Sequence, residues 1–299
     1  MTDSVLPAPP LRPQRVVYFG TPEAAVPPLE ALLAAGIDVP LVISRGPRRR
    51  GRRAEPTPSP VAAAAAAAGI PVSTVIGDAV GVGADCGVVV AFGRIIPVEV
   101  LAVLPMINVH FSLLPRWRGA APVERAVLAG DPKTGVCVMG LEPALDTGPV
   151  YGRAEVEIDP LESASELRAR LVGIGSDLLV ESLQQGLVAP RAQVGDVTYA
   201  DKIERSDLEL RWDLPAVDLH RRVRVGGAWT TVRGRLLKVH EASVDPAGDL
   251  AQGELAGTRV GCAAGSLVLA VVQPEGRARI AAPDWVNGAR LDPSERLGA

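Results

Sequence analysis

Short apolar runs alternate with amphipathic stretches up to about residue 187. Runs that are rich in β-branched residues and bounded by glycine or proline predict buried strands: RVVYFG (15–20), VPLVIS (39–44), CGVVVAFG (86–93), INVH (107–110) and GVCVMGL (135–141). Strands that alternate with helices form a mostly parallel sheet with helices on both faces. The pattern therefore predicts a Rossmann-like α/β domain.

Capping residues mark where several of the predicted helices begin. Thr21 is expected to cap the helix after the first strand, and Ser59 the alanine-rich helix after the second. Ser163 and Glu166 form a Ser-x-x-Glu capping box at the start of a longer helix. The spacing of apolar residues gives that helix a buried face of Leu167, Leu171, Ile174, Leu178 and Leu183. Two shorter helices are expected over 97–104 and 122–130.

The composition divides the chain into four parts. Residues 1–14 carry four prolines and no periodicity, which is typical of a flexible tail. The α/β pattern occupies 15–187, and 188–206 is an aperiodic linker. From 207 to 299, short β-rich runs separated by glycine predict a small antiparallel barrel.

Aromatic residues make up only 3% of the chain although 47% of it is hydrophobic, so the core must be built from aliphatic side chains. The cysteines, Cys86, Cys137 and Cys262, are far apart without a CxxC pair, and are expected to be reduced structural thiols. No apolar run approaches the ~20 residues that span a bilayer, and the start lacks the features of a signal peptide. We expect a soluble, cytoplasmic protein.

Positive charge is clustered, although the formal net charge is −3. The segment RGPRRRGRR (45–53) contains no acid and six arginines: Arg45, Arg48, Arg49, Arg50, Arg52 and Arg53. A second basic cluster comprises Arg221, Arg222, Arg224, Arg233, Arg235 and Lys238. Local basic patches on a mildly acidic protein suit contact with a polyanion. The alternative for the first segment is a solvated, disordered tether.

Candidate catalytic residues gather at the end of one predicted strand. Asn108 and His110 are two residues apart, so both side chains leave the strand on the same side, and Val109 faces the other way. Asp146 follows the next strand along the chain. In open parallel sheets, ligands bind beyond the carboxyl ends of the strands, so we expect the three side chains to meet in one crevice there.

This trio suits acyl transfer without a covalent intermediate. An amide and an imidazolium can donate hydrogen bonds to an oxyanion, and a carboxylate can orient the imidazole or take a proton from an amine. The alternative is a structural pair at Asn108 and His110, with Asp146 as a turn former. No GxSxG nucleophile motif is present, and the spacing of the three histidines predicts no metal site.

A resemblance to methionyl-tRNA formyltransferases is carried by NVHFSLLPRWRGAAP (108–122), with FGTPEAAVPPLEAL upstream, PTPSPV between them and LDTGPV downstream. It extends from about residue 15 to 297 and includes TYADKI, GGAWTTVRGRLLKV and GARLDPSERLG. The first glycine turn, Gly20-Thr21-Pro22, lacks GxGxxG, and in this family the fold does not bind a dinucleotide.

The resemblance implies roles for particular residues. Asn108, His110 and Asp146 match the catalytic residues of the family. The loop that contacts 10-formyltetrahydrofolate corresponds to Ser112, Leu113, Leu114 and Pro115. The arginine-rich segment takes the place of a basic loop that reaches the acceptor end of the initiator tRNA, through Arg45, Arg48, Arg49, Arg50, Arg52 and Arg53. The C-terminal barrel corresponds to an OB-like domain that helps to hold the tRNA, and a monomer without a metal is expected.

The resemblance leads to one favoured function and two alternatives. The favoured reaction moves a formyl group from 10-formyltetrahydrofolate to the α-amine of methionyl initiator tRNA. A related formyltransferase that acts on a nucleotide-linked amino sugar would share the catalytic trio, but has no need of a basic loop or a C-terminal barrel. A non-catalytic RNA-binding module would have no need of an intact trio.

Overall fold

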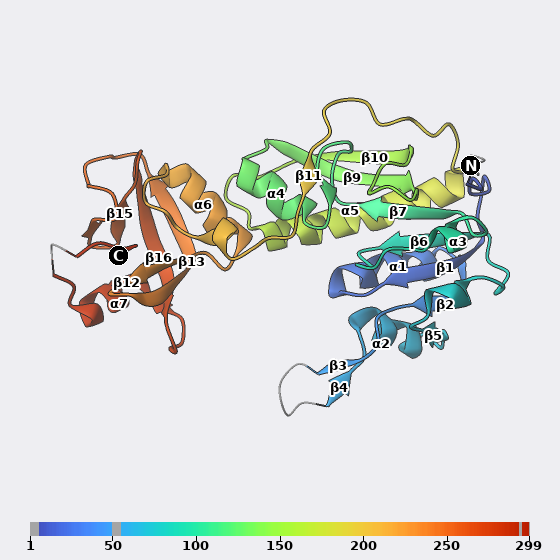
Figure 1. Cartoon of the computed structure of the whole chain (residues 1–299), viewed down its shortest axis with the longest axis horizontal. Helices are drawn as coiled ribbons and strands as arrows, with labels where there is room; N and C mark the ends of the chain where they lie inside the picture. Colours follow the sequence, from blue (N-terminus) through green and yellow to red (C-terminus); the bar gives the residue numbers. More distant parts are fainter. Residues whose placement is uncertain (1–5, 50–54, 293–294, 299) are drawn as a thin grey trace. The chain divides into compact units, whose positions relative to one another are not determined.

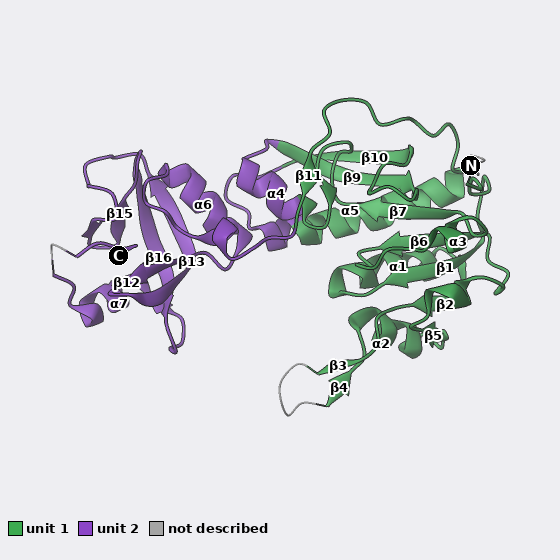
Figure 2. Cartoon of the chain, in the orientation of Figure 1, with its two compact units in different colours: residues 1–122, 133–157, 168–201 green, residues 123–132, 158–167, 202–299 purple. Residues whose placement is uncertain are grey.

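The computed structural model describes residues 6–49, 55–292 and 295–298, which form two compact units (Figure 2). Unit 1 comprises residues 1–122, 133–157 and 168–201. Unit 2 comprises residues 123–132, 158–167 and 202–299. Both units therefore contain residues from the α/β pattern of the sequence.

Unit 1 is built on a sheet that has seven strands among the described residues, in the order β10-β9-β7-β6-β1-β2-β5 (Figure 1). The strands are β1 Arg15–Gly20, β2 Asp38–Ile43, β5 Val72–Ser73, β6 Cys86–Val90, β7 Met106–His110, β9 Lys133–Gly140 and β10 Val150–Glu157. Five neighbouring strands of the sheet, β7, β6, β1, β2 and β5, run parallel to one another. Strand β9 is antiparallel to β7, and β10 is antiparallel to β9. The predicted mostly parallel sheet is confirmed.

Helices cover one face of β1 close to its carboxyl end. The Tyr18 hydroxyl, which is fully buried, donates a hydrogen bond of 2.6 Å to the carbonyl of Ala25. Val61 approaches Gly20 from the same side. The helical elements of unit 1 are η1 Glu23–Ala25, α1 Val26–Ala34, α2 Pro60–Ala67, η2 Ile76–Ala79, α3 Val98–Leu101 and most of α5 Ala164–Gln185.

The opposite face of β1 packs against η2 and α3. Val17 and Phe19 alternate with Tyr18 along the strand and belong to a cluster with residues of both helices. Phe19 meets Phe92 edge to face, with the ring centroids 5.6 Å apart. Burial of each such side chain stabilises the fold by about 1.5–3 kcal/mol. Both faces of the sheet are thus covered, as the sequence predicts.

Two of the three predicted helix caps are confirmed. The Ser59 hydroxyl accepts a hydrogen bond of 3.1 Å from the Ala62 N–H. Ser163 and Glu166 form the reciprocal capping box, with N···O distances of 2.7 and 3.2 Å. The prediction that Thr21 caps the helix after β1 is wrong. Its hydroxyl donates to the Phe92 carbonyl, and the helical segment after β1 begins with the 3-10 turn η1, whose N-cap is Pro22.

The structure differs from the sequence pattern at two other elements, a strand that the pattern does not predict and a helix that is shorter than predicted. Strand β10 was not expected, because its run YGRAEVE is mostly polar and has partly exposed side chains. The helix expected over 97–104 is only the short α3, although its apolar residues Val100, Leu101 and Leu104 are buried. On α5, Leu167, Leu171 and Leu183 are buried as predicted, whereas Ile174 and Leu178 are only partly buried.

Unit 2 contains an antiparallel sheet of the order β12-β13-β16-β15-β14, with β17 paired to β16. Its elements are α4 Pro122–Ala129, η3 Ser206–Leu208, α6 Ala216–Val225, β12 Trp229–Val232, β13 Arg235–Asp245, β14 Leu255–Ala256, β15 Arg259–Gly261, β16 Ser266–Pro274, β17 Ile280–Ala281 and α7 Ala282–Ala289. Close to the C-terminus, the Gly298 N–H donates to Thr231 on β12, and the Leu297 N–H donates to Gly253. The final segment therefore links the two edges of the sheet, as a small barrel requires.

Arginine side chains explain why unit 2 includes residues 123–132 and 158–167. Arg125 on α4 donates a hydrogen bond of 2.9 Å to Asp207. Arg224 on α6 donates to the carbonyls of Glu162 and Asp159 at 2.8 and 2.7 Å. These polar contacts leave no sign in an apolar pattern. The sequence pattern therefore placed both segments in the α/β part of the chain, 15–187. Among the described residues, the structure contains no helix that is long and apolar enough to cross a membrane.

Candidate active site

Strand β7 directs Asn108 and His110 to one face of the sheet. Their neighbours across the antiparallel pair with β9 are Met139 and Cys137, which therefore lie on the same face. Val109 points to the other face, where it lies next to Gly175 of α5. His110 is only 5% exposed, whereas Asn108 is partly exposed, so the site is open to solvent along one side.

The imidazole of His110 lies between two hydrogen-bond acceptors. Its Nε2 is 2.9 Å from the carbonyl oxygen of Trp117, and its Nδ1 is 3.6 Å from Oδ2 of Asp146. Because a carbonyl oxygen can only accept, Nε2 must donate the hydrogen. Nδ1 is the ring atom that faces the carboxylate of Asp146.

Asp146 is held in an uncommon backbone conformation. Its φ of 51° lies in the left-handed region, which non-glycine residues rarely adopt. Its Oδ2 accepts a hydrogen bond of 2.8 Å from the Gly119 N–H. The carboxylate is thus fixed by the loop that follows β7, next to His110.

The contact between Asp146 and His110 is confirmed, but not by the predicted route. In the expected arrangement, both residues follow the carboxyl ends of neighbouring strands. Strand β9 instead runs antiparallel, and Gly140 at its carboxyl end pairs with Ile107 near the start of β7. The loop from β9 must therefore turn back, and it does so closely, since a Cβ on Gly148 would lie 1.9 Å from the Gly140 carbonyl oxygen.

The loop after β7 folds over the same face of the sheet. Leu114 clusters with Cys137 and Met139. The Ser112 hydroxyl, in a fully buried side chain, donates a hydrogen bond of 2.6 Å to the Arg116 carbonyl. Ser112 and Leu114 are thus bound into a preformed loop. Burial raises the pKa of the Cys137 thiol, so this neighbour of His110 stays protonated near neutral pH.

The predicted linker forms part of this site. The Trp117 N–H donates a hydrogen bond of 2.9 Å to Thr198 Oγ1. Beside it, the short strands β8 (Arg118–Gly119) and β11 (Tyr199–Ala200) pair in parallel. Further along, Gln193 contacts Arg118 and the backbone of the Asp146 loop. Sequence reasoning missed Gln193 and Thr198 because isolated polar residues in an aperiodic segment carry no pattern.

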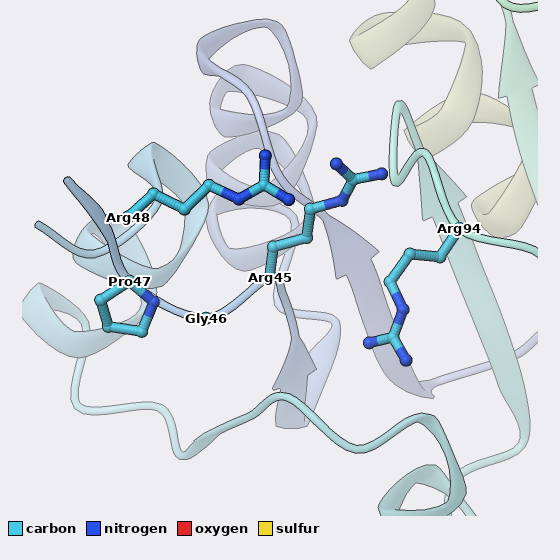
Figure 3. A pocket seen from close by; sticks show the side chains of 5 residues that line it. All are labelled: Arg45, Gly46, Pro47, Arg48 and Arg94. Atoms are coloured by element: carbon cyan, nitrogen blue, oxygen red, sulfur yellow. The ribbon is translucent and has the colours of Figure 1, made fainter. Parts of the chain in front are cut away.

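Arginines line a hollow of about 490 Å³ beside β2 (Figure 3). Arg45 and Arg48 come from the predicted arginine-rich segment, and Arg94 from the loop after β6 was not predicted. Arg94 donates to the Thr74 carbonyl at 2.7 Å and lies over the Phe92 ring. Arg45 donates to the Gly93 carbonyl. Neither pairs with a carboxylate among the described residues.

The short hairpin β3 (Arg48–Arg49) and β4 (Pro56–Thr57) exposes Arg48 and Arg49. Three other predicted tRNA-binding residues, Arg50, Arg52 and Arg53, lie outside the described residues. Two members of the second basic cluster pair with acids within unit 2. There, Arg221 pairs with Asp218 and Arg233 pairs with Glu295.

Comparison with known proteins defines the class. Residues 14–183 match the formyl transferase family, and residues 202–290 match the formyl transferase C-terminal domain. The chain therefore belongs to the formyl transferase family. It is also 42% identical over 308 residues to the methionyl-tRNA formyltransferase of Methylococcus capsulatus, across 95% of this chain and 99% of that protein.

Solved structures share the fold at lower identity. A methionyl-tRNA formyltransferase from Clostridium thermocellum is 15% identical, with a TM-score of 0.57, over 77% of this chain and 93% of that one. An N-formyltransferase from Helicobacter canadensis, solved with folinic acid and dTDP-3-aminofucose, is 16% identical, with a TM-score of 0.66, over 87% and 99%. These likenesses concern the fold and do not distinguish between acceptors.

Proposed function

We propose that this protein transfers the formyl group of 10-formyltetrahydrofolate to the α-amino group of methionyl initiator tRNA. The observation that carries the proposal is the contact between His110 and Asp146 next to Asn108, in a chain 42% identical to a methionyl-tRNA formyltransferase. The amino-sugar alternative has weaker support, because its structural relative is only 16% identical.

In the proposed reaction, the amine nitrogen bonds to the formyl carbon and the bond from that carbon to N10 of the folate then breaks. The amine loses a proton and N10 gains one. An α-amine with a reference pKa of about 7.7–8.0 is partly neutral near pH 7, so activation of the nucleophile is a small task. Orientation and oxyanion stabilisation are the larger ones.

Each catalytic residue then has a distinct role. Asn108 donates its amide hydrogen to the oxyanion, since its side chain is partly exposed on the same face of the sheet as His110. His110 stabilises the oxyanion through positive charge. Asp146 supports that charge and orients the ring, or takes the proton of the amine.

The folate is proposed to bind at Ser112, Leu113, Leu114 and Pro115. Hydrogen bonds within the loop and from the Thr198 N–H to the Pro115 carbonyl hold this segment in place. A preformed loop with apolar side chains suits a rigid planar ring, because little conformational entropy is lost on binding. The bound folate supplies the activated formyl group.

The acceptor end of the tRNA is proposed to contact Arg45, Arg48 and Arg49, together with Arg50, Arg52 and Arg53. Arg45, Arg48 and Arg49 have no carboxylate partner among the described residues, which leaves their guanidinium groups available for bidentate contacts with phosphate. The OB-like unit 2 would hold the body of the tRNA. We further propose that the protein acts as a monomer in the cytoplasm, where charged tRNA is present.

The test is a formylation assay read by mass spectrometry. Purified protein receives 10-formyltetrahydrofolate and methionine-charged initiator or elongator tRNA. Formyl-methionine on the initiator alone is the expected result. No product on either tRNA, from folded protein that binds folate, would overturn the proposal and favour an amino-sugar acceptor.

A further inference from the structure

Gln193 lies at the centre of a hydrogen-bonded cluster around the Asp146 loop. Its Oε1 accepts hydrogen bonds from Nε and Nη2 of Arg118, at 3.0 and 2.6 Å. Its Nε2 donates to the backbone carbonyls of Asp146 and Gly148, both at 2.8 Å. The amide therefore uses both of its donors and its acceptor, and only this orientation satisfies all four contacts.

These contacts act on the turn in which Asp146 has a left-handed backbone, with a φ of 51°. A left-handed conformation costs a non-glycine residue about 1–2 kcal/mol. Without the amide hydrogens of Gln193, two carbonyl oxygens of the same turn would lose their partners. Rotation of that turn would carry the Asp146 carboxylate away from the Gly119 N–H and from His110.

We infer that Gln193 is a positioning residue that acts through Asp146. It anchors the backbone of the turn, and Arg118 anchors Gln193, so that the carboxylate faces Nδ1 of His110. Gln193 bonds to no catalytic side chain directly. The kinetic test of this inference rests on the proposed function, whereas the test by histidine NMR does not.

The first experiment compares Gln193→Leu and Gln193→Glu with the wild type. Leucine removes all four hydrogen bonds at similar volume. Glutamate keeps the pairing with Arg118, and so keeps the linker attached, but places carboxylate oxygens against two carbonyl oxygens. Gln185→Leu is the control, since Gln185 is exposed and bonds only to Glu181 of its own helix.

We expect both Gln193 variants to lower kcat about 10–100-fold, because small misplacements of catalytic groups have effects of this size. The KM for each substrate should stay within about twofold, and Gln185→Leu should behave as the wild type. A normal kcat in Gln193→Glu, with the linker still attached, would overturn the inference.

A double-mutant cycle separates positioning from general stability. If Gln193 acts only through Asp146, then Gln193→Leu should lower the single-turnover rate of an Asp146→Asn background by less than twofold. If the two effects multiply, Gln193 does not act through Asp146 and the inference is wrong.

Histidine NMR provides a readout without turnover. The chain has only three histidines, so the His110 ring signals can be assigned by substitution. Gln193→Leu should shift the His110 signals and leave those of His220 and His240 in unit 2 unchanged. An unchanged His110 spectrum would overturn the inference. Failure of the wild type to formylate tRNA would overturn only the proposed function.

Discussion

The backbone N–H of Gly119 donates a hydrogen bond of 2.8 Å to Oδ2 of Asp146, the oxygen atom that also faces His110. Gly119 has a φ of 124°, and a Cβ at this position would lie 2.9 Å from the Ala200 carbonyl oxygen. The close approach of β8 and β11 therefore needs glycine, and it places the N–H that fixes the carboxylate.

Gly119→Ala should lower both stability and kcat. We expect the free energy of unfolding to fall by about 1–3 kcal/mol, because of backbone strain and the clash with Ala200. The control is Gly173→Ala on α5, where an added Cβ meets nothing within 4 Å. That change should stabilise the helix by about 0.5–1 kcal/mol. Urea unfolding and the formylation rate test both variants, and equal behaviour would contradict the argument.

Asp146→Asn should reduce kcat by at least about 100-fold while the fold survives, because removing a preorganised charge from a catalytic site typically costs this much. His110→Ala should have a similar effect. Asp177→Asn on the exposed surface of α5 is the matched control. Steady-state kinetics and circular dichroism provide the measurements. A folded variant with near-normal kcat would remove that residue from the mechanism.

Replacing Arg48 and Arg49 with alanine should raise the KM for tRNA and leave folate binding unchanged. Each lost phosphate contact should also make the salt dependence of tRNA binding less steep, by about 0.7–0.9 in the slope of log K against log salt. Arg153→Ala, which removes one exposed charge from β10, is the control. Equal KM values for variant and wild type would refute the role of the hairpin.

The thiol of Cys86 should be unreactive in the native protein. Burial raises its pKa to about 12, so almost no thiolate exists at pH 8. Cys137 and Cys262 are also buried, and burial raises their pKa values. A thiol reagent should therefore label all three cysteines only in denaturant. Rapid labelling of native protein would show that the core opens readily.

Acid should weaken unit 2 through Asp207. Its pKa is lowered, first by the hydrogen bond from the Glu204 N–H and also by Arg125. A carboxyl with a lowered pKa adds stability above its unfolded pKa of about 3.9 and loses it as the pH falls through the folded value. Asp207→Asn should therefore be less stable than the wild type at pH 7, with a difference that disappears under acid conditions. A constant difference from pH 7 to pH 2 would contradict this.

Local patterns were enough for much of the fold. The alternation of β-branched runs and capped helices gave five strands of the main sheet, and Ser59 and Ser163 cap where the sequence placed them. Short-range rules succeed here because strand burial and helix capping depend on residues close in sequence. They failed at Thr21, where a distant carbonyl of Phe92 offers the hydroxyl a different partner.

The candidate site follows the same division. The sequence by itself determined that Asn108 and His110 share one face of a strand, because alternate residues of any strand point the same way. Only the tertiary structure decided how Asp146 reaches His110 and that Gln193 and Gly119 hold it there. Those contacts join residues 27 to 47 positions apart, and such pairs depend on the reversal of β9 and the return of the linker rather than on any local pattern.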